Sequence, residues 1–600
     1  MTSSTAMDSL MRKASCTPEI RDLAVIGDRR TAAVVSRGAE VVWYCPGRFD
    51  APSILSGLLG GDHGSLRLVS PGMKPVSRDY LGESGVLRTR LATEAGEVSV
   101  TDWLNFGDAP NGALCRMVSP APAACELRLS LRPGYARRSP DSERFGDTAM
   151  AAGEGGTVHA SHPLGEDDGE IVCRVPQGEE AWMVLADDGV ELSPDREIVG
   201  RWLDATLAAW GAISRPPDTG VYGRAFADSL RALRLLTYEP TGAVVAAVTT
   251  SLPEIPGGTR NYDYRYAWLR DAGMIASAIV RAGNAGLDAQ GFLGFVCSTK
   301  RSGMEPPLPA LADLDGKPAA DAGELPLAGY RESRPVRIGN AANDQLQLDG
   351  LGNVLLAAKL IYGSTDAERP HWATVSEVAD YLAGHWNEPD HGIWEEETRL
   401  HYTSSKVIVA CGLDSIAGFA DDPAQAERWR AAVRDIRAFV ASECLTAEGA
   451  YASVAGGADV DVSAALFPVW AYTSADTPEM IATMKVLERD HSPDGLLFRR
   501  TLVCADAAQE GAFLAGTLWV AHYWAIRGEP ARARRIIDRA LDYANDLGLF
   551  AEEADPQTGE MVGNFPQSFV HAALIGAVVD LRAALDAEAM EPGKENSHAS

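Results

Sequence analysis

Two short acidic stretches of this 600-residue chain carry carboxyl groups that can act as a pair. They are Gly392–Thr398 (GIWEEET) and Gly548–Glu560 (GLFAEEADPQTGE). A carboxyl group held beside an indole in a partly desolvated pocket keeps its proton near neutral pH and can serve as a general acid. A second carboxylate can activate water as a base. Such a pair is what glycoside hydrolysis requires, since one group protonates the leaving oxygen and the other acts as base or nucleophile.

Two further stretches have side chains suited to sugars. Arg260–Asp271 (RNYDYRYAWLRD) combines three tyrosines and a tryptophan with arginine and aspartate. Aromatic faces pack against the apolar faces of sugar rings, and charged groups form strong hydrogen bonds with hydroxyls. Arg337–Asp349 (RIGNAANDQLQLD) concentrates amides and an acid at the start of an expected helix. Together the four stretches predict a carbohydrate site.

Each stretch also has a purely structural explanation, and the residues alone leave both readings open. Asp271 can cap its helix while the neighbouring aromatic side chains fill the core. The glutamates after Trp394 can form a solvated loop, and 83 acidic residues make chance pairs of carboxylates frequent. The amides of 337–349 can cap a helix and line its polar face.

Other chemistries have weaker signals. The sequence contains neither a GxxxxGK[ST] phosphate-binding loop nor a GxSxG nucleophile motif. Its nine cysteines are scattered and form no CxxC pair, which argues against a disulfide framework or a zinc site and favours buried thiols in a reducing compartment. His385 and His391 have a loose spacing for metal ligands and no third partner. We therefore expect no metal and no cofactor.

The charge balance excludes some partners. Asp and Glu total 83 against 54 Lys and Arg, for a net charge of −29. This excess makes binding to nucleic acid or to an anionic membrane surface improbable. No apolar run reaches the length of about 18 residues that a spanning helix needs, and the first twenty residues lack the apolar core of a secretory signal. We expect a cytoplasmic protein, and no feature of the sequence indicates an oligomeric state.

The chain changes character near residue 215. Before that point, short β-like segments alternate with turn formers, which predicts an antiparallel β-sandwich. The predicted strands are Thr31–Val35, Glu40–Tyr44, Gly85–Leu91, Glu97–Trp103, Ala124–Leu131, Ile171–Val175 and Ala181–Leu185. The stretch Ser139–Gly169, rich in Gly, Asp, Glu and Ser, is expected to include loose loops.

After residue 215 the hydrophobic pattern becomes helical. Apolar residues within Asp422–Val440 recur at spacings of 4, 3 and 4, and Asp422 is expected to cap this helix ahead of Pro423. Similar patterns predict helices over 223–238, 273–282, 344–360, 372–385, 406–420, 477–490, 511–526, 530–548 and 568–584. The long polar connection 300–340 is either a mobile insertion or a loop that lines a site.

Taken in order, these stretches resemble glycoside hydrolase family fifteen, the group of glucoamylases, glucodextranases and bacterial trehalases. The matching segments are 26–53, 240–254, 260–272, 329–355, 392–397, 403–407 and 548–574. The resemblance implies an N-terminal β-sandwich over 16–215 and a catalytic (α/α)6 barrel over 220–590. That division agrees with the independent change of periodicity near residue 215.

The resemblance also implies a chemistry: inverting, exo-acting hydrolysis of an α-glucoside, releasing β-glucose from the non-reducing end. Glu395 would be the general acid and Glu552 the general base, about 6.5–9.5 Å apart so that a water fits between substrate and base. The implied substrate-binding residues are Arg270 and Asp271, which would grip the terminal glucose, Tyr264 and Trp268, which would shape its pocket, and Gln347, Asp349 and Trp394 at further subsites.

The sequence departs from the family pattern near these residues. Tyr262 and Ala267 stand where the family often has tryptophan and cysteine, and the acidic pair Glu396-Glu397 replaces the familiar arginine. Val570 stands where serine is common. The extra negative charge beside the general acid would raise its pKa.

The expected partner is a small neutral carbohydrate. Trehalose, isomaltose-type sugars and short malto-oligosaccharides all fit the family, and a soluble short substrate is favoured over raw starch. Two other classes of function remain as alternatives: a disaccharide phosphorylase of related architecture, and a non-catalytic sugar-binding protein.

Overall fold

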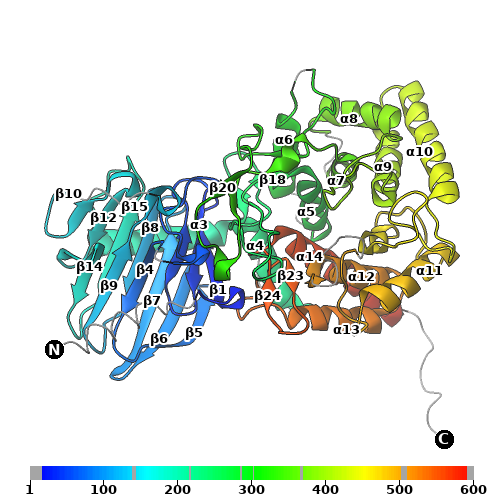
Figure 1. Ribbon diagram of the computed structural model, residues 1–600. Coiled ribbons are helices and arrows are strands. Elements are labelled where there is room, and N and C mark those ends of the chain that lie inside the picture. Colours follow the sequence, from blue (N-terminus) through cyan, green and yellow to red (C-terminus); the bar gives the residue numbers. More distant parts are fainter. Residues whose placement is uncertain are drawn as a thin grey trace, which may run out of the picture.

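Figure 1 shows a computed structural model of the chain, which describes residues 17–61, 63–137, 143–214, 218–283, 287–301, 303–364, 369–501 and 510–590. Strands dominate the N-terminal part, drawn in blue and cyan, and helices dominate the C-terminal part, drawn from green to red. The predicted fold class, a β-sandwich followed by an all-α unit, is confirmed.

Two antiparallel sheets, of seven and eight strands within the described residues, make up the sandwich. Their strand orders are β1-β2-β3-β4-β9-β14-β13 and β10-β11-β12-β15-β8-β7-β6-β5. The strands of the first sheet are β1 (Leu23–Gly27), β2 (Ala32–Ser36), β3 (Val41–Tyr44), β4 (Ser65–Val69), β9 (Cys125–Ser130), β13 (Leu164–Asp167) and β14 (Glu170–Val175). Those of the second are β5 (Lys74–Tyr80), β6 (Leu87–Thr93), β7 (Gly96–Leu104), β8 (Ala113–Val118), β10 (Glu143–Arg144), β11 (Ala149–Ala151), β12 (Thr157–Ala160) and β15 (Ala181–Ala186).

A period of two is visible in the half-buried strands, whereas β1, β2, β3 and β15 are buried along their whole length. In β7, Val98 and Val100 are buried while Glu97 is exposed and Ser99 is partly exposed, as a half-buried strand requires. All seven predicted strands are present, with ends shifted by one or two residues. In the described residues of 139–169, the expected loops alternate with the short strands β10–β13, which were not predicted. Each of these strands spans only two to four residues, too few for alternation to show, and pairing with its neighbours in the sheet fixes it.

Helix α3 (Arg196–Ile213) covers the second sheet and was not predicted. Asp195 caps it by accepting a hydrogen bond from Ile198 N at 2.7 Å. Its Val199 belongs to one buried cluster with Trp103 and Trp182 of the sheet.

The helical unit alternates inner and outer helices. The inner ones are α5 (Leu269–Arg281), α7 (Leu348–Ser364), α9 (Thr403–Ile416), α12 (Leu514–Ile526) and α14 (Ser568–Met590). The outer ones are α4 (Gly223–Leu235), α6 (Leu287–Ser298), α8 (Trp372–His385), α10 (Pro423–Glu443), α11 (Pro478–Val486) and α13 (Pro530–Leu541). Inner helices pack on one another in the order α12, α14, α5, α7, α9. The short 3-10 helix η7 (Val462–Leu466), which lies between α10 and α11 in the sequence, packs on α12. Because each outer helix reverses the chain, the inner helices run in parallel and their N-terminal ends share one end of the ring.

Ten predicted helices are present. Asp422 caps α10 as predicted, accepting from Ala424 N at 2.9 Å. Helix α6 was missed, and the helix expected to run to Gly548 ends at Leu541. Helix α14 is long and apolar enough to cross a membrane by length and composition, but two thirds of its apolar window is buried as an inner helix of the barrel. The seven cysteines within the described residues are buried and free, as expected, while Cys16 and Cys504 lie outside those residues.

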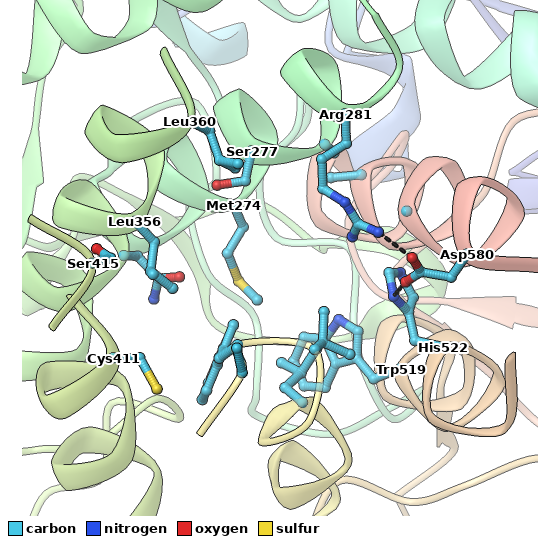
Figure 2. Close-up of a pocket in the computed structure, with 18 of the residues that line it drawn as sticks. Met274, Ser277, Arg281, Leu356, Leu360, Cys411, Ser415, Trp519, His522 and Asp580 are labelled. Carbon is cyan, nitrogen blue, oxygen red and sulfur yellow. Dashed lines mark hydrogen bonds and ion pairs between the residues drawn. The ribbon is translucent and has the colours of Figure 1, made fainter. Parts of the chain in front are cut away.

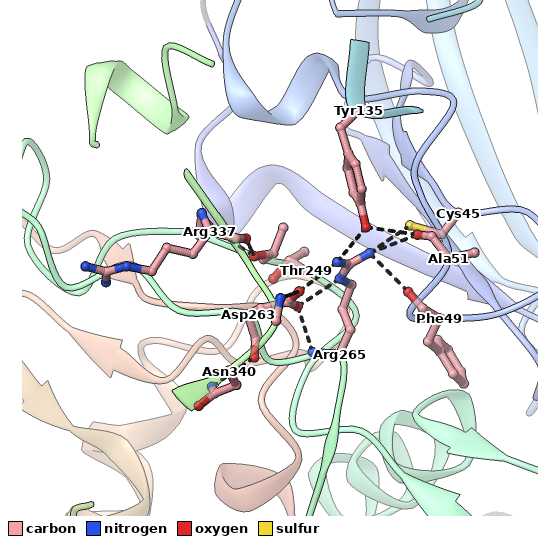
Figure 3. Close-up of polar contacts among 12 residues, drawn as sticks. Cys45, Phe49, Ala51, Tyr135, Thr249, Asp263, Arg265, Arg337 and Asn340 are labelled. Atoms are coloured by element: carbon pink, nitrogen blue, oxygen red, sulfur yellow. Dashed lines mark hydrogen bonds and ion pairs between the residues drawn. The ribbon is translucent and has the colours of Figure 1, made fainter. Parts of the chain in front are cut away.

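One buried arginine joins the sandwich to the helical unit (Figure 3). Arg265 forms a two-pronged ion pair with Asp263, at 2.8 and 2.7 Å, and donates to Ala51 O and to the Tyr135 hydroxyl, each at 3.0 Å. Asp263 also accepts from the backbone of Gly339 at 3.2 Å. The same ion pair therefore holds two sandwich loops and the end of the 300–340 connection.

The 300–340 connection forms part of a cavity wall. Its described residues include the strand pair β20 (Gly323–Leu325) and β21 (Val336–Ile338). Ala322, Arg337, Gly339 and Asn340 line the cavity described next. Of the two expectations for this segment, the one of a loop lining a site agrees with the structure.

Candidate active site

A cavity of about 460 Å³ lies at the N-terminal ends of the inner helices. Seven of the nine predicted site residues line it: Tyr264, Trp268, Arg270, Asp271, Trp394, Glu395 and Glu552. They come from three distant parts of the chain, and the parallel inner helices bring these parts together at one end of the ring. Volume and wall suit a small polar ligand.

An unusual backbone conformation presents Glu395 to this cavity. Its φ is +62°, in the left-handed region that non-glycine residues seldom adopt. Gly392, three residues earlier, has φ +66°, and a Cβ there would lie 2.7 Å from the Tyr402 ring. Gln345 Nε2 donates to the Glu395 carbonyl at 3.1 Å. The sharp turn is thus held from both sides, as expected where a side chain must be aimed at a ligand.

Arg270 lies between two carboxyl groups. Its Nε donates to Asp271 at 2.8 Å, its Nη1 donates to Glu395 Oε1 at 3.2 Å, and Nη1 also donates to the Ile393 carbonyl. The Glu395 side chain remains 24% exposed, so a ligand can reach it. Burial raises the pKa of Glu395, Arg270 opposes that rise, and the negative charge of Asp271 adds to it. The negative charge that adds to this rise is therefore that of Asp271 on α5, whereas the sequence pointed to the neighbouring Glu396-Glu397 pair.

Glu552 faces the cavity from the turn before strand β23 (Glu553–Ala554). The Tyr264 hydroxyl donates to its Oε1 at 2.8 Å, whereas its buried Oε2 has no hydrogen-bond partner within the described residues. Burial and the charge of Glu254 raise its pKa, and Arg500 opposes them. Gly563 makes this placement possible, because it has φ +84° and a Cβ there would lie 2.7 Å from the Glu552 Cβ.

Aromatic side chains close the floor beneath Glu395. Trp394 stacks on Trp519 with ring centroids 5.9 Å apart and meets Phe513 edge-on at 5.2 Å. Its indole N–H donates to Asp461, whose pKa burial raises to about 6. These contacts fix the indole, which also lines the cavity.

Two predicted subsite residues, Gln347 and Asp349, do not line the cavity. Both are buried, and Gln347 Nε2 donates to Gln345 Oε1 at 2.9 Å, so that Gln345 provides the wall. The carboxyl oxygens of Asp349 have no hydrogen bond within the described residues, and burial raises its pKa to about 7 against the pull of Arg270. Gln345 and Gln347 stand two residues apart just before α7, yet only Gln345 lines the cavity. Spacing alone does not reveal this difference.

Sequence reasoning missed a second group of cavity residues. Arg500 is 6% exposed and forms ion pairs with Glu254 at 2.8 Å and with Glu510. Arg260 also pairs with Glu254, at 3.0 Å. Glu254 could have been identified from the sequence, because it lies inside segment 240–254, which matches the family. Arg500 lies in no recognisable motif.

Within the described residues, one group of side chains has the geometry to hold a metal ion. It consists of Glu254, Glu510 and Glu553, whose carboxyl oxygens lie within 4.8 Å of one another. The guanidinium of Arg500 already contacts two of these carboxylates, and this positive charge disfavours a cation at the same place. His385 and His391 each bond a backbone carbonyl through Nδ1, at 2.8 and 2.7 Å.

Comparisons with known proteins agree with this geometry. The profile of the family described as Glycosyl hydrolases family 15 matches residues 220–527 and 525–579, and that of the family described as Trehalase-like, N-terminal matches 11–152. A protein named Trehalase from Mycolicibacterium smegmatis is 31% identical over 94% of this chain and 91% of its own length. Trehalase 1 of Sulfolobus acidocaldarius is 29% identical over 94% of this chain and 99% of its own.

Solved structures show the same fold. A bacterial glucoamylase complexed with acarbose covers 96% of this chain and 97% of its own, with a TM-score of 0.69 at 13% identity. The ring of helices is thus an (α/α)6 barrel of the glucoamylase type. The family profile covers more than half of the chain and the trehalases align along nearly all of it, so this glycoside hydrolase belongs to glycosyl hydrolase family 15.

Proposed function

We propose that the enzyme hydrolyses a short α-glucoside, trehalose above all, by an inverting and exo-acting mechanism. The observation that carries the proposal is the arrangement of Glu395 and Glu552, which line one cavity from two different loops. Glu395 is partly exposed, and Glu552 Oε2 has no hydrogen-bond partner within the described residues. An inverting hydrolase needs two such groups, an acid for the leaving oxygen and a base for water.

Glu395 is the proposed general acid. Its raised pKa keeps a proton on the carboxyl group at higher pH than in an ordinary glutamate. Within the described residues, Arg270 holds the Oε1 side through a 3.2 Å contact, and partial exposure leaves the group open to the glycosidic oxygen. As the bond breaks, the proton passes to the leaving sugar and the new carboxylate is stabilised by the guanidinium.

Glu552 is the proposed general base. Tyr264 fixes its Oε1, so the unpartnered Oε2 is the atom that takes the proton from water. Its raised pKa means that the ionised form appears only at higher pH than for a free glutamate. The activity should therefore fall on the acid side as Glu552 gains a proton, and on the alkaline side as Glu395 loses one.

Arg270 and Asp271 are the proposed grip on the terminal glucose. Arg270 uses Nε and Nη1 within the protein, and Nη2 and Asp271 Oδ2 form no hydrogen bond in the described part of the chain. These atoms can meet sugar hydroxyls with charge-assisted hydrogen bonds. Tyr264 and Trp268, whose rings meet edge-on at 5.7 Å, form the adjoining wall.

Trehalose is favoured among the possible substrates because the relatives that align with nearly the whole chain carry the name trehalase. Isomaltose-type sugars and malto-oligosaccharides remain the competing substrates. A small neutral sugar is also the partner that a chain with a net charge of −29 accepts without repulsion. We expect the reaction to take place in the cytoplasm.

A substrate panel tests this function. Purified enzyme is assayed for glucose release from trehalose, isomaltose, maltose and maltotriose, each with and without inorganic phosphate. We expect the largest kcat/KM for trehalose and no sugar phosphate among the products. Glucose 1-phosphate as the main product would instead identify a phosphorylase, and no turnover of any sugar would leave only a binding protein.

A further inference from the structure

A second cavity, of about 500 Å³, lies at the opposite end of the barrel (Figure 2). All five inner helices contribute to its wall, α14 mostly through its N-terminal half, together with residues 466–471. The side chains labelled in Figure 2 are Met274, Ser277, Arg281, Leu356, Leu360, Cys411, Ser415, Trp519, His522 and Asp580. The proposed chemistry uses none of them.

An incomplete ring explains this cavity. The inner helices α5, α7, α9, α12 and α14 have 13 to 23 residues, whereas η7, which stands between α10 and α11 in the chain, has five. Such a short element fills the ring near the catalytic end and leaves the far end open. The residues that follow it, among them Val469 and Trp470, form one side of the cavity.

The wall of the cavity is mainly apolar. Met274, Leu356, Trp470 and Trp519 contribute large hydrophobic surfaces. Small residues of α14, Ala572, Ala573 and Gly576, keep the space open on the other side. An apolar wall of this size suits a ligand with an aromatic or branched aliphatic body.

Charges at the cavity favour an anion. Three cationic side chains, Arg281, Lys359 and Arg437, line it against two aspartates, Asp414 and Asp580. Arg281 and His522 both contact Asp580, so the negative charge of this carboxylate is balanced within the cavity wall. Among the described residues, Lys359 and Arg437 form no ion pair. A local excess of positive charge is distinctive in a chain with a net charge of −29.

The two cavities share a partition. Phe569 lines both of them. Trp519, in the wall of the second cavity, meets Phe569 edge-on at 5.2 Å and stacks on Trp394 of the first. The Arg270 guanidinium lies 5.3 Å from the centre of the Phe569 ring. Movement of either ring therefore reaches the proposed acid and sugar grip through direct contacts.

We propose that this cavity is a second binding site, which takes a small anion with an aromatic or aliphatic body, and that its occupant alters the catalytic cavity through Trp519 and Phe569. The body packs on Trp470 and Trp519. The acidic group faces Lys359 and Arg437 at the mouth.

Binding is measured on the full chain with the fluorescent anion anilinonaphthalene sulfonate. We expect saturable binding of one molecule per chain, and its loss in Ser415→Trp, which places an indole inside the cavity. Ser442→Trp is the matched control, because Ser415 and Ser442 each donate to the carbonyl three residues earlier and Ser442 is exposed on α10. Equal binding by the two variants would overturn the proposal, as would the absence of saturable binding to the wild type.

The preference for an anion is tested with a neutral probe. N-phenylnaphthylamine has the same aromatic body without the sulfonate, and we expect it to bind about tenfold more weakly. Lys359→Gln should weaken binding of the sulfonate only, while Lys485→Gln, an exposed lysine on α11, should leave it unchanged. Equal affinity for both probes in the wild type would contradict the proposed charge preference.

The coupling is read from the activity, using the glucoside that the enzyme hydrolyses fastest. Saturating probe should change kcat by about fivefold or more, at substrate concentrations far above KM. Ser415→Trp should remove this response. Since binding is read without turnover, a failure of the substrate assignment leaves the binding result intact. Probe that binds in the wild type yet leaves kcat and KM unchanged would refute the coupling.

Discussion

The chain places two buried arginine–carboxylate clusters within ten residues of each other, and they differ in how fully they are satisfied. At the junction of the sandwich and the helical unit, both oxygens of Asp263 receive hydrogen bonds from Arg265, and the arginine donates to two further groups of the sandwich. At the cavity, Glu395 receives one contact of 3.2 Å from Arg270, and one oxygen of Glu552 has no partner within the described residues.

This difference separates structure from function. A buried polar atom without a partner costs free energy, and where such an atom belongs to a residue that lines a cavity, a ligand can supply the missing partner. Both carboxyl oxygens of Asp263 in the junction cluster have partners without a ligand, so this cluster serves to hold the sandwich to the helical unit. The cluster at the cavity lacks hydrogen-bond partners that a sugar and a water can supply.

The largest expected effects are on the two carboxyl groups proposed as general acid and general base. Glu395→Gln and Glu552→Gln should each lower kcat by about 10²–10⁴-fold, because a glutamine neither gives nor takes the required proton. Thermal unfolding should change little. Glu397→Gln, an exposed neighbour at the rim of the cavity, is the control and should retain most of the activity. Full activity in either catalytic variant would show that the roles are assigned wrongly.

The two arginines should respond in opposite ways. Arg265→Met leaves Asp263 buried without its partner and should lower the free energy of unfolding by about 3–5 kcal/mol, with a smaller effect on kcat per folded molecule than the substitution of Arg270. Arg270→Met should lower kcat/KM by about 10²-fold or more and cost less stability. Urea unfolding and steady-state kinetics measure both quantities.

If Arg265→Met does not fold, Arg265→Lys gives the same comparison, since it keeps the charge and loses the two-pronged geometry. A greater loss of stability at Arg270 than at Arg265, with activity retained, would contradict the distinction between the junction cluster and the cluster at the cavity.

A smaller effect is expected on the pH profile. Glu254 raises the pKa of Glu552, so Glu254→Gln removes a negative charge and should lower that pKa. The base then ionises at lower pH, and the acid limb of the kcat/KM profile moves to lower pH. Glu324→Gln, on exposed β20, is the control and should leave the limb in place. A shift to higher pH would mean that Glu552 does not control this limb.

Much of the fold was predictable because it rests on local patterns. Local patterns predicted seven strands, β6, β7 and β9 among them, and the apolar stripes with a cap such as Asp422 predicted most helices. Helices α3 and α6, strands such as β5 and β8, and the short strands β10–β13 were not predicted, because their place depends on sheet and helix neighbours that are distant in the chain.

Those residues of the site that belong to recognisable motifs could be predicted from the sequence. Motif positions identified seven residues that do line one cavity, including both carboxyl groups. Spacing alone did not reveal that Gln345 rather than Gln347 forms the wall, nor that Arg500 completes it, because side-chain direction and long-range ion pairs arise only in the folded barrel. The same sequence stretch, Arg260–Asp271, contains both Arg265 of the junction and Arg270 of the cavity, and nothing in the sequence distinguishes them.

The central claim, inversion at one glucose by the pair Glu395 and Glu552, is tested most directly by proton NMR of the first products from trehalose. Inversion at the attacked carbon gives one β-glucose, and the leaving glucose keeps its α configuration. The account therefore predicts equal initial amounts of α- and β-glucose, before mutarotation mixes them. Initial release of α-glucose alone would mean retention of configuration and would contradict the proposed mechanism.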